Sequence, residues 1–533
     1  MRLLHAGIAI VSLLLRATCQ DSTPPRYDLV LRGGQLIDGT KAPAVPGDLA
    51  ITAGRIAALG TFPIPPGTPV LPITGLQVVP GFLDVHTHVD TDVVREPLCS
   101  NFLRMGVTTI VTGNCGGSVT DLAAHFARLE QGGIGPNYGS LVGHGTVRRA
   151  VLGTENRAPT AEELRRMGDL VQQAIQAGAF GMSTGLIYVP GIYCKTDELI
   201  DLAKIVARHG GLYASHIRSE NDDVRTAITE ALSIGEQAGV AIEISHLKCT
   251  GKPNHGRAEE VLQMLQAARS RGQRVHVDQY AYDCSSTGLD VLFPAEELAV
   301  DRDAFGKRLA TDAAYRASIH AALLRKMDQV GFGDFRYARI AAAKGNEGLN
   351  GLLIPAAAKQ QFGRDDRDAQ AELAIALFVA AAPARVTMIY HTMSEADVQR
   401  FLREDWIAIA SDAGLRQEGG PEKPHPRGAG NNPRVLGHYV RELQVLDLPT
   451  AIHKMTAVPA AAFGIKDRGV LRVGAYADLV VFDAATVADQ ATVADPLAHP
   501  VGIRAVFVNG QLAVDRDQVV GVRAGMVLRA PPR

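Results

Sequence analysis

The sequence predicts a (β/α)8 TIM-like barrel with a small β-sandwich domain built from the N- and C-terminal segments. Three observations support this prediction. A histidine pair, His86 and His88, follows the apolar run LQVVPGFL, and further reactive side chains end short apolar runs downstream. Barrel enzymes place their reactive residues at such strand ends. Strand-like and helix-like segments also alternate through the middle of the chain, and both of its ends are rich in short strands.

The two terminal segments have the same sequence pattern. Short strands with glycine turns and no long helical pattern run through YDLVLRGGQLIDGT and DLAITAGRIAALG, and they return in RGVLRVGAYADLVVFDAATV and GIRAVFVNGQLAV. This pattern favours a small β-sandwich. We therefore expect residues 27–80 and 469–533 to form the sandwich and residues 81–468 to form the barrel.

Helical segments alternate with the strands of the predicted barrel. Thr160 and Glu163 form a capping-box signature at the start of TAEELRRMGDLVQQAIQAG, which leads into the strand-like AFGMSTGL. SEADVQRFLRE leads into DWIAIASDAG in the same way. From about residue 289 to 350 the pattern loosens into charged helical pieces, which predicts an insertion between barrel units.

The overall composition excludes some classes of protein. With 533 residues and 46% hydrophobic residues, the chain exceeds one ordinary domain and can bury a large core. A formal net charge of −2 and the lack of a basic run predict no nucleic-acid partner. Outside the N-terminus no segment reaches the roughly 20 apolar residues of a membrane span. The composition leaves the oligomeric state open.

The N-terminus predicts a secretory signal peptide over residues 1–19, and hence a periplasmic or secreted protein. Arg2 precedes the apolar run AGIAIVSLLL, and Ala17 follows it near a candidate cleavage site. Arg16 interrupts this pattern, which leaves a buried N-terminal helix as the alternative and argues against a lipid anchor on Cys19. The five later cysteines are odd in number and irregularly spaced, which argues against a disulfide framework.

Five side chains are candidate metal ligands, and one carboxylate is a candidate base. Two histidines at i and i+2 on a strand point to the same side, although such a pair alone often only hydrogen-bonds in a core. A hydrolytic zinc site needs imidazole or thiolate ligands, an open position for water and a carboxylate that moves protons. The candidates are His86 and His88 in DVHTHVD, Cys115 in TTIVTGNCGG, His216 in GLYASHIRSE, His246 in VAIEISHLKC, and Asp412 in WIAIASDAG.

These motifs together resemble the amidohydrolase superfamily and, within it, the N-acyl-D-amino-acid deacylases or D-aminoacylases. The resemblance covers almost the whole chain after the signal peptide. It also rests on GVTTIVTGNCG, LVGHGTVR, GMSTGLIYVPG, ISHLKCTGKPNHGR, HPRGAGNNPRVLGHYVRE, KMTAVPAAAFGI and GAYADLVVFDAATVAD.

The resemblance implies one tight zinc and a second, weaker metal position. Cys115, His216 and His246 would hold the tight zinc, and His86 with His88 would form the second position, sharing Cys115. Relatives that hydrolyse cyclic amides bridge two metals with a carboxylated lysine on the fourth strand. The corresponding segment here, GAFGMSTGL, has no lysine, so a cysteine bridge fits better.

The implied reaction is hydrolysis of a linear amide in an N-acyl-D-amino acid or a related amide with a D-residue. A zinc-activated water attacks the carbonyl, with Asp412 as general base and then general acid. The resemblance assigns the substrate's α-carboxylate to Lys248, Tyr280 and Ser286, and it places Tyr188 near the scissile amide. Lys248 also follows His246 by two positions, so if the strand extends that far, its ammonium lies on the same face as the His246 ring.

Departures from the family pattern leave the preferred acyl group and side chain open. They are Ala281 between two tyrosines, Leu247 where histidine is common, and Asn432 where an aromatic residue is usual.

Other positions and other functions also stay open at this point. We interpret Arg218 and Glu220 as support for the metal ligands, whereas Arg427 and Arg434 either touch substrate or pair on the surface. The alternative functions are a hydantoinase- or dihydroorotase-like hydrolase of cyclic amides and a non-catalytic binding protein on the same fold.

Overall fold

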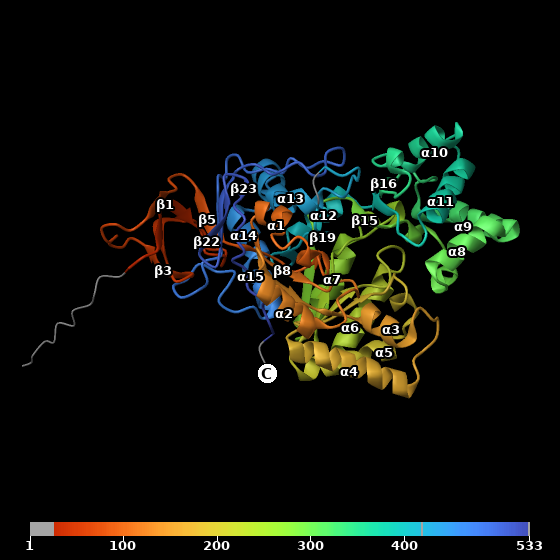
Figure 1. Ribbon diagram of the computed structural model, residues 1–533, viewed down its shortest axis with the longest axis horizontal. Coiled ribbons are helices and arrows are strands. Elements are labelled where there is room, and N and C mark those ends of the chain that lie inside the picture. Colours follow the sequence, from red (N-terminus) through yellow and green to blue (C-terminus); the bar gives the residue numbers. More distant parts are fainter. Residues whose placement is uncertain (1–25, 417–418, 531–533) are drawn as a thin grey trace, which may run out of the picture.

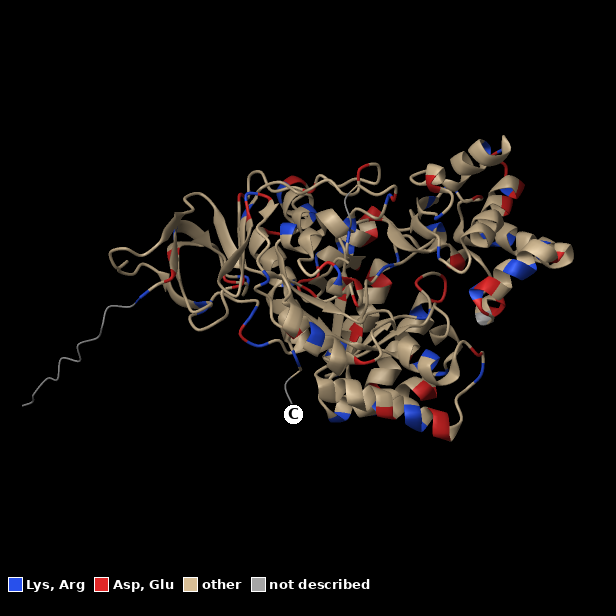
Figure 2. Ribbon diagram, in the orientation of Figure 1, with Lys and Arg blue, Asp and Glu red and all other residues tan. Residues whose placement is uncertain are grey.

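A computed structural model describes residues 26–416 and 419–530 (Figure 1). The signal peptide expected over residues 1–19 lies outside the described residues. A sheet built from the two terminal segments lies at one end of the molecule, the barrel lies in the middle, and a mainly helical unit lies at the other end (Figure 1). Lys and Arg are interspersed with Asp and Glu along the helices (Figure 2).

Parallel strands form the barrel in chain order. One ladder joins β6, β8 and β9, and the next joins β10, β11, β12, β13, β14 and β18. β7 pairs in parallel with β19, which closes the ring between the first and last strands and confirms the predicted barrel. The bounds are β6 Phe82–Asp84, β7 Thr87–His88, β8 Val107–Thr112, β9 Asn137–Ser140, β10 Val142–Gly143, β11 Gly181–Gly185, β12 Leu212–His216, β13 Ala241–Ile244, β14 Val275–Gln279, β18 Ala408–Ile409 and β19 Ala413–Gly414.

Helices connect these strands and bury one apolar face against them. α4 begins with the predicted capping box, because the Thr160 side chain accepts from Glu163 N and the Glu163 carboxylate accepts from Thr160 N. It ends at Gly178, whose φ of 113° suits glycine. No helix of the described residues is long and apolar enough to cross a membrane. The barrel helices are α1 Ser100–Arg104, α2 Leu122–Gly132, α3 His144–Leu152, α4 Ala161–Ala177, α5 Thr196–Arg208, α6 Val224–Ala238, α7 Ala258–Ser270, α12 Glu395–Leu402, α13 Arg427–Arg434, α14 Leu448–Met455 and α15 Ala457–Phe463.

Both ends of the chain contribute strands to one nine-stranded sheet, so the two segments join in one β-rich unit. β5 from the N-terminal segment pairs antiparallel with β20 from the C-terminal segment. Leu31 and Ile51 share one core with Val481 and Phe507, so strands of both segments bury the same apolar interior. The strands are β1 Leu29–Leu36, β2 Val45–Thr52, β3 Arg55–Gly60, β4 Val70–Pro72, β5 Gln77–Pro80, β20 Leu479–Phe482, β21 Ile503–Val508, β22 Gln511–Asp515 and β23 Gln518–Val519.

The insertion is larger than the sequence suggests. Its separate hydrophobic core runs from Leu289 to Tyr390, so the expected boundary near residue 350 is wrong. The alanine-rich α11 packs inside this second core. The elements are β15 Ser285–Gly288, α8 Arg302–Thr311, α9 Ala313–Val330, β16 Ala338–Ala342, α10 Ile354–Phe362, α11 Arg367–Ala381 and β17 Thr387–Tyr390.

Candidate metal centre

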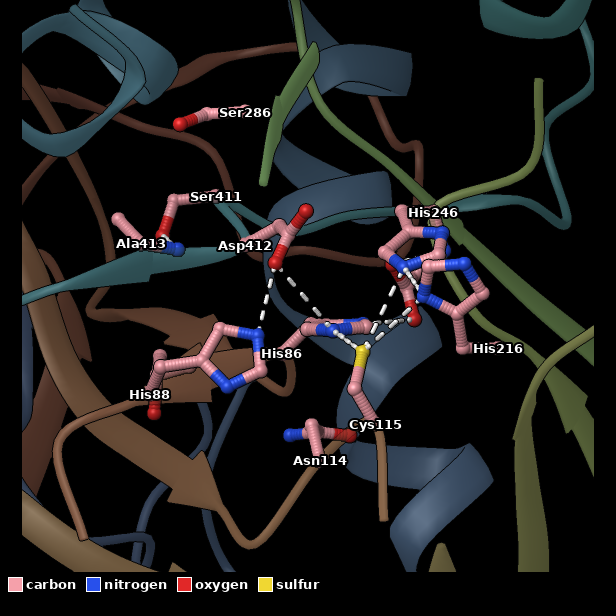
Figure 3. A network of polar contacts seen from close by, with 12 residues as sticks. His86, His88, Asn114, Cys115, His216, His246, Ser286, Ser411, Asp412 and Ala413 are labelled. Carbon is pink, nitrogen blue, oxygen red and sulfur yellow. Dashed lines mark hydrogen bonds and ion pairs between the residues drawn. The ribbon is translucent and has the colours of Figure 1, made fainter. Parts of the chain in front are cut away.

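The predicted ligands converge where the barrel strands end (Figure 3). Sγ of Cys115 lies 3.3 Å from Nε2 of His86, 3.5 Å from Nδ1 of His216 and 3.5 Å from Nε2 of His246. The last two nitrogens are 2.9 Å apart. The ring of His88 contacts that of His86, with centroids 5.4 Å apart. Donor atoms from several strands therefore face one small volume.

The backbone at this centre adopts a conformation that side-chain-bearing residues rarely take. Cys115, His246 and Asp412 have φ values of 51°, 36° and 53°. Such residues cost about 1–3 kcal/mol each and persist where the surrounding structure holds them, often at functional sites. Asn114 helps to hold the backbone next to Cys115, because its Nδ2 donates to the carbonyl oxygens of Val85 and Val111 at 3.2 Å each.

Asp412 is the carboxylate of the centre. Its Oδ1 lies 2.9 Å from Nε2 of His88 and 3.5 Å from Nε2 of His86, and its Oδ2 lies 2.8 Å from Nη1 of Arg427. Burial alone would raise the pKa of Asp412, but the Arg427 guanidinium and the imidazoles of His246 and His86 hold it well below its usual range. The carboxylate is therefore ionised.

Cys115 differs electrostatically from the other described cysteines. Burial raises the pKa of Cys194, Cys249 and Cys284 to about 12, and that of Cys99 further still. Burial acts on Cys115 too, but the surrounding imidazoles outweigh it and hold its pKa well below the usual value. Because the thiolate is the metal-binding form of cysteine, Cys115 is prepared for this role.

The donor set fits zinc. Thiolate and imidazole are the ligands that zinc prefers, and the outward nitrogens of two imidazoles face carboxylates. Nδ1 of His246 lies 3.1 Å from Oε1 of Glu220, and Nδ1 of His86 lies 3.1 Å from Oδ2 of Asp278. A proton on Nδ1 of His86 leaves the lone pair of its Nε2 facing the centre, so the Asp278 carboxylate favours the tautomer that metal binding needs. Nδ1 of His246 also lies 2.8 Å from Nζ of Lys248, an ammonium that can only donate.

Arg218 lies away from the metal centre, contrary to the expectation that it supports the ligands. Its guanidinium bonds both carboxylate oxygens of Glu230 at 2.9 Å and donates to the carbonyl oxygens of Ile192 and Cys194 at 3.1 and 3.2 Å. β12 ends at His216, so strand alternation no longer dictates where the side chain two residues later points. Arg218 instead fastens the loop that carries Tyr188.

The four expected substrate-binding residues lie in and around this centre. Nζ of Lys248 is 2.6 Å from Oε1 of Glu220, and the Tyr188 ring lies 5.1 Å from that of His216. Tyr280 directly follows β14, and Ser286 lies in β15 of the insertion. The Tyr280 hydroxyl contacts Sδ of Met393 at 3.5 Å, and the Ser286 hydroxyl donates to the carbonyl oxygen of Met388 at 2.9 Å. Figure 3 shows Ser286 beyond Asp412 as seen from Cys115.

A second buried group of candidate ligands lies outside the centre and does not suit a metal. His144, Cys194 and Glu198 lie within 4.8 Å of one another. Nε of Arg148 lies 3.1 Å from the same Glu198 oxygen that His144 contacts, and Arg218 reaches to 3.9 Å from Sγ of Cys194. Two guanidinium groups compensate the cluster, and burial keeps the Cys194 thiol protonated. Its contacts are those of a structural ion-pair network.

The sequence did not single out Asp278, and it left the role of Arg427 open. Asp278 is a carboxylate near the end of β14, and it bonds two candidate ligands. Its place at a strand end, which also identified Asp412, could have pointed to it. Arg427 is buried against Asp412. Arg434 lies farther out, where it donates to the carbonyl oxygen of Ala281 at 2.8 Å and contacts Asp489 at 3.4 Å.

Comparisons with known proteins agree with this geometry. Residues 73–514 match the model of the amidohydrolase family. The chain is 37% identical to a D-aminoacylase of Alcaligenes xylosoxydans xylosoxydans, over 95% of this chain and 98% of that protein, and 36% identical to an N-acyl-D-aspartate deacylase of the same organism, over 95% and 96%.

A solved structure matches the fold at similar sequence identity. The N-acyl-D-glutamate deacylase of Bordetella bronchiseptica, solved with zinc and a phosphonate mimic of the tetrahedral intermediate, superposes with a TM-score of 0.80. The identity is 34%, over 95% of this chain and 100% of that one. The chain belongs to the amidohydrolase family.

Proposed function

We propose that this chain is a zinc-dependent hydrolase that releases a D-amino acid and a carboxylic acid from N-acyl-D-amino acids or related D-residue amides. The observation that carries the proposal is the convergence of the Cys115 thiolate, several imidazoles and the Asp412 carboxylate at one end of the barrel. The similar D-aminoacylase and the zinc-containing Bordetella deacylase support the same chemistry.

The metal would be held by side chains whose donor atoms already face one another. Cys115, His216 and His246 would hold the tight zinc, and His86 with His88 would offer a second, weaker position next to the same thiolate. When bound, zinc supplies a Lewis acid that polarises a carbonyl and lowers the pKa of water to about 7.

Asp412 would move the proton. Its carboxylate is ionised, buried and in contact with the imidazole of His88. It is therefore placed to accept a proton from the attacking water and to return that proton to the leaving amine. Arg427 forms an ion pair with the other oxygen, which holds the carboxylate in place.

The substrate would be oriented by cations and hydroxyls around the centre. Lys248, Tyr280 and Ser286 would hold its α-carboxylate, and Tyr188, next to His216, would lie beside the scissile amide. With the carboxylate and the carbonyl both fixed, the side chain can occupy only one of the two remaining directions at Cα. The site then accepts one enantiomer, and the similar deacylases indicate the D form.

A paired substrate screen tests this function. Purified protein is assayed with matched N-acetyl-D- and N-acetyl-L-amino acids of apolar and acidic side chains, and with hydantoin and dihydroorotate. Zinc content is measured on the same sample. We expect turnover of the D series alone. Comparable turnover of the L series, or faster hydrolysis of the cyclic amides, would contradict the proposal.

We also propose that the protein is exported, on the strength of the apolar N-terminal run. Cell fractionation with intact-mass analysis checks this. Mature protein in the periplasm or the medium, shortened by about the length of a signal peptide, supports export. Full-length protein in the cytoplasm contradicts it.

A further inference from the structure

Glu243 lies inside the barrel beneath the metal centre. It is on β13, and its side chain is 1% exposed. Its neighbours Ile242 and Ile244 belong to the core shared with the surrounding helices, so alternation along the strand directs Glu243 toward the barrel interior. No donor group among the described residues bonds either of its carboxyl oxygens.

An ionised carboxylate at this position would be costly, because no donor among the described residues bonds its oxygens. Burial and the charge of Asp278 raise the pKa of Glu243 well above its usual value and outweigh the His86 imidazole, which lowers it. Glu243 stands opposite His276 in the parallel pairing of β13 with β14, so Asp278, two residues farther along β14, lies on the same face beside it. A neutral carboxylic acid has an O–H that can donate to this carboxylate.

Asp278 connects this acid to the metal centre. Its Oδ1 accepts from the backbone N–H of His246 at 2.8 Å, and its Oδ2 lies 3.1 Å from Nδ1 of His86. An ionised carboxylate offers about four lone-pair sites, so a third donor can be accommodated. With the proton on Nδ1, Nε2 of His86 keeps its lone pair toward Sγ of Cys115, 3.3 Å away.

We propose that Glu243 is a protonated acid that donates its hydrogen to Asp278 and, through Asp278, positions the His86 ring and the His246 backbone at the metal centre. Glu243 is thus a positioning residue. It touches neither substrate nor metal, and it acts by holding the carboxylate that orients two ligands. The inference rests on the proposed zinc site.

Two substitutions of similar size separate donation from simple packing. In Glu243→Gln the side-chain amide still donates to Asp278, whereas in Glu243→Leu the donor is lost. Metal affinity is measured by competition with a chromogenic chelator, at matched protein stability. We expect the leucine variant to bind zinc roughly 10- to 100-fold more weakly, the usual effect of losing a residue that supports ligands, and the glutamine variant to stay within about tenfold of the native protein.

Equal loss of affinity in both variants, or no loss in the leucine variant, would overturn the proposal.

Infrared spectroscopy provides a second test that does not depend on the leucine variant folding. The native protein at pH 8 should show the carbonyl band of a buried protonated carboxyl, and this band should be missing from Glu243→Gln. Its absence from the native protein would also overturn the proposal. If the native protein binds no zinc at all, the proposed function itself fails, and the two failures are thereby distinguished.

Discussion

Nη1 of Arg427 lies 2.8 Å from Oδ2 of Asp412, and both side chains are less than a tenth exposed. The guanidinium also lies over the ring of Tyr280, with its carbon 4.8 Å from the centroid. A buried pair of this kind is costly to break, because removing one partner leaves the other charged and uncompensated. The pair therefore links the stability of the barrel to the group that we propose moves the proton.

Replacing Arg427 should lower the free energy of unfolding, and part of this loss should disappear when Asp412 is replaced as well. We expect Arg427→Gln to lower the free energy of unfolding by up to about 3–5 kcal/mol, because it removes the largest of the charges that compensate the buried Asp412 carboxylate. The double variant with Asp412→Asn should lose less than the sum of the two single variants. Urea unfolding of the four proteins at one zinc concentration gives the comparison. Additivity within about 0.5 kcal/mol would show that the ion pair contributes no coupling.

The thiolate of Cys115 should be required for the metal. We expect Cys115→Ala to lower both zinc content and turnover, because it removes the donor that faces His86, His216 and His246. Cys99→Ala is the matched control, since Cys99 is a buried thiol whose pKa is raised by burial. Elemental analysis and kinetics on the same samples test this. A Cys115→Ala variant with full zinc and full activity would refute the shared-thiolate assignment.

Arg218 should affect substrate turnover without affecting the metal. Its bonds to the carbonyl oxygens of Ile192 and Cys194 hold the loop that carries Tyr188. We expect Arg218→Met to reduce kcat/KM roughly 10- to 100-fold, because a small displacement of a positioning group costs that much, and to leave zinc content unchanged. A loss of zinc comparable to that of Cys115→Ala would show that Arg218 supports the metal ligands after all.

Lys454 should make stability depend on pH. It is fully buried, and burial lowers its pKa from 10.5 to about 7. Between these two pH values the unfolded chain binds more protons than the folded one, so the free energy of unfolding rises as pH rises through this window. Lys454→Met should lose this dependence. Urea unfolding at pH 7.5 and 9.5 measures it, and parallel changes in both proteins would contradict the assignment.

Strand ends were the most predictable part of this molecule. His86, Cys115, His216, His246 and Asp412 each follow a short apolar run, and in a parallel barrel all such runs end on one face. The positions of these side chains therefore follow from topology, which the alternation of strands and helices already indicates. The capping box of α4 was equally local and was found in the structure.

Features that depend on distant packing were not predictable. Arg218 follows the end of β12, where the chain direction changes and alternation gives no guide. Glu243 stands in a strand whose residues are all buried, so the sequence does not tell which face carries it. The boundary of the insertion was misplaced because α11 has the composition of a barrel helix, and only its partners in the second core distinguish it.

Asp412→Asn tests most directly whether Asp412 moves protons at a zinc ion that other residues hold. Turnover of an N-acetyl-D-amino acid and zinc content are measured on the same purified samples. We expect kcat to fall by about 10² to 10⁴, the usual contribution of a positioned general base, with zinc content unchanged. Full activity in this variant would mean that another group moves the proton, and loss of zinc would mean that Asp412 is chiefly a ligand; either result would contradict the account.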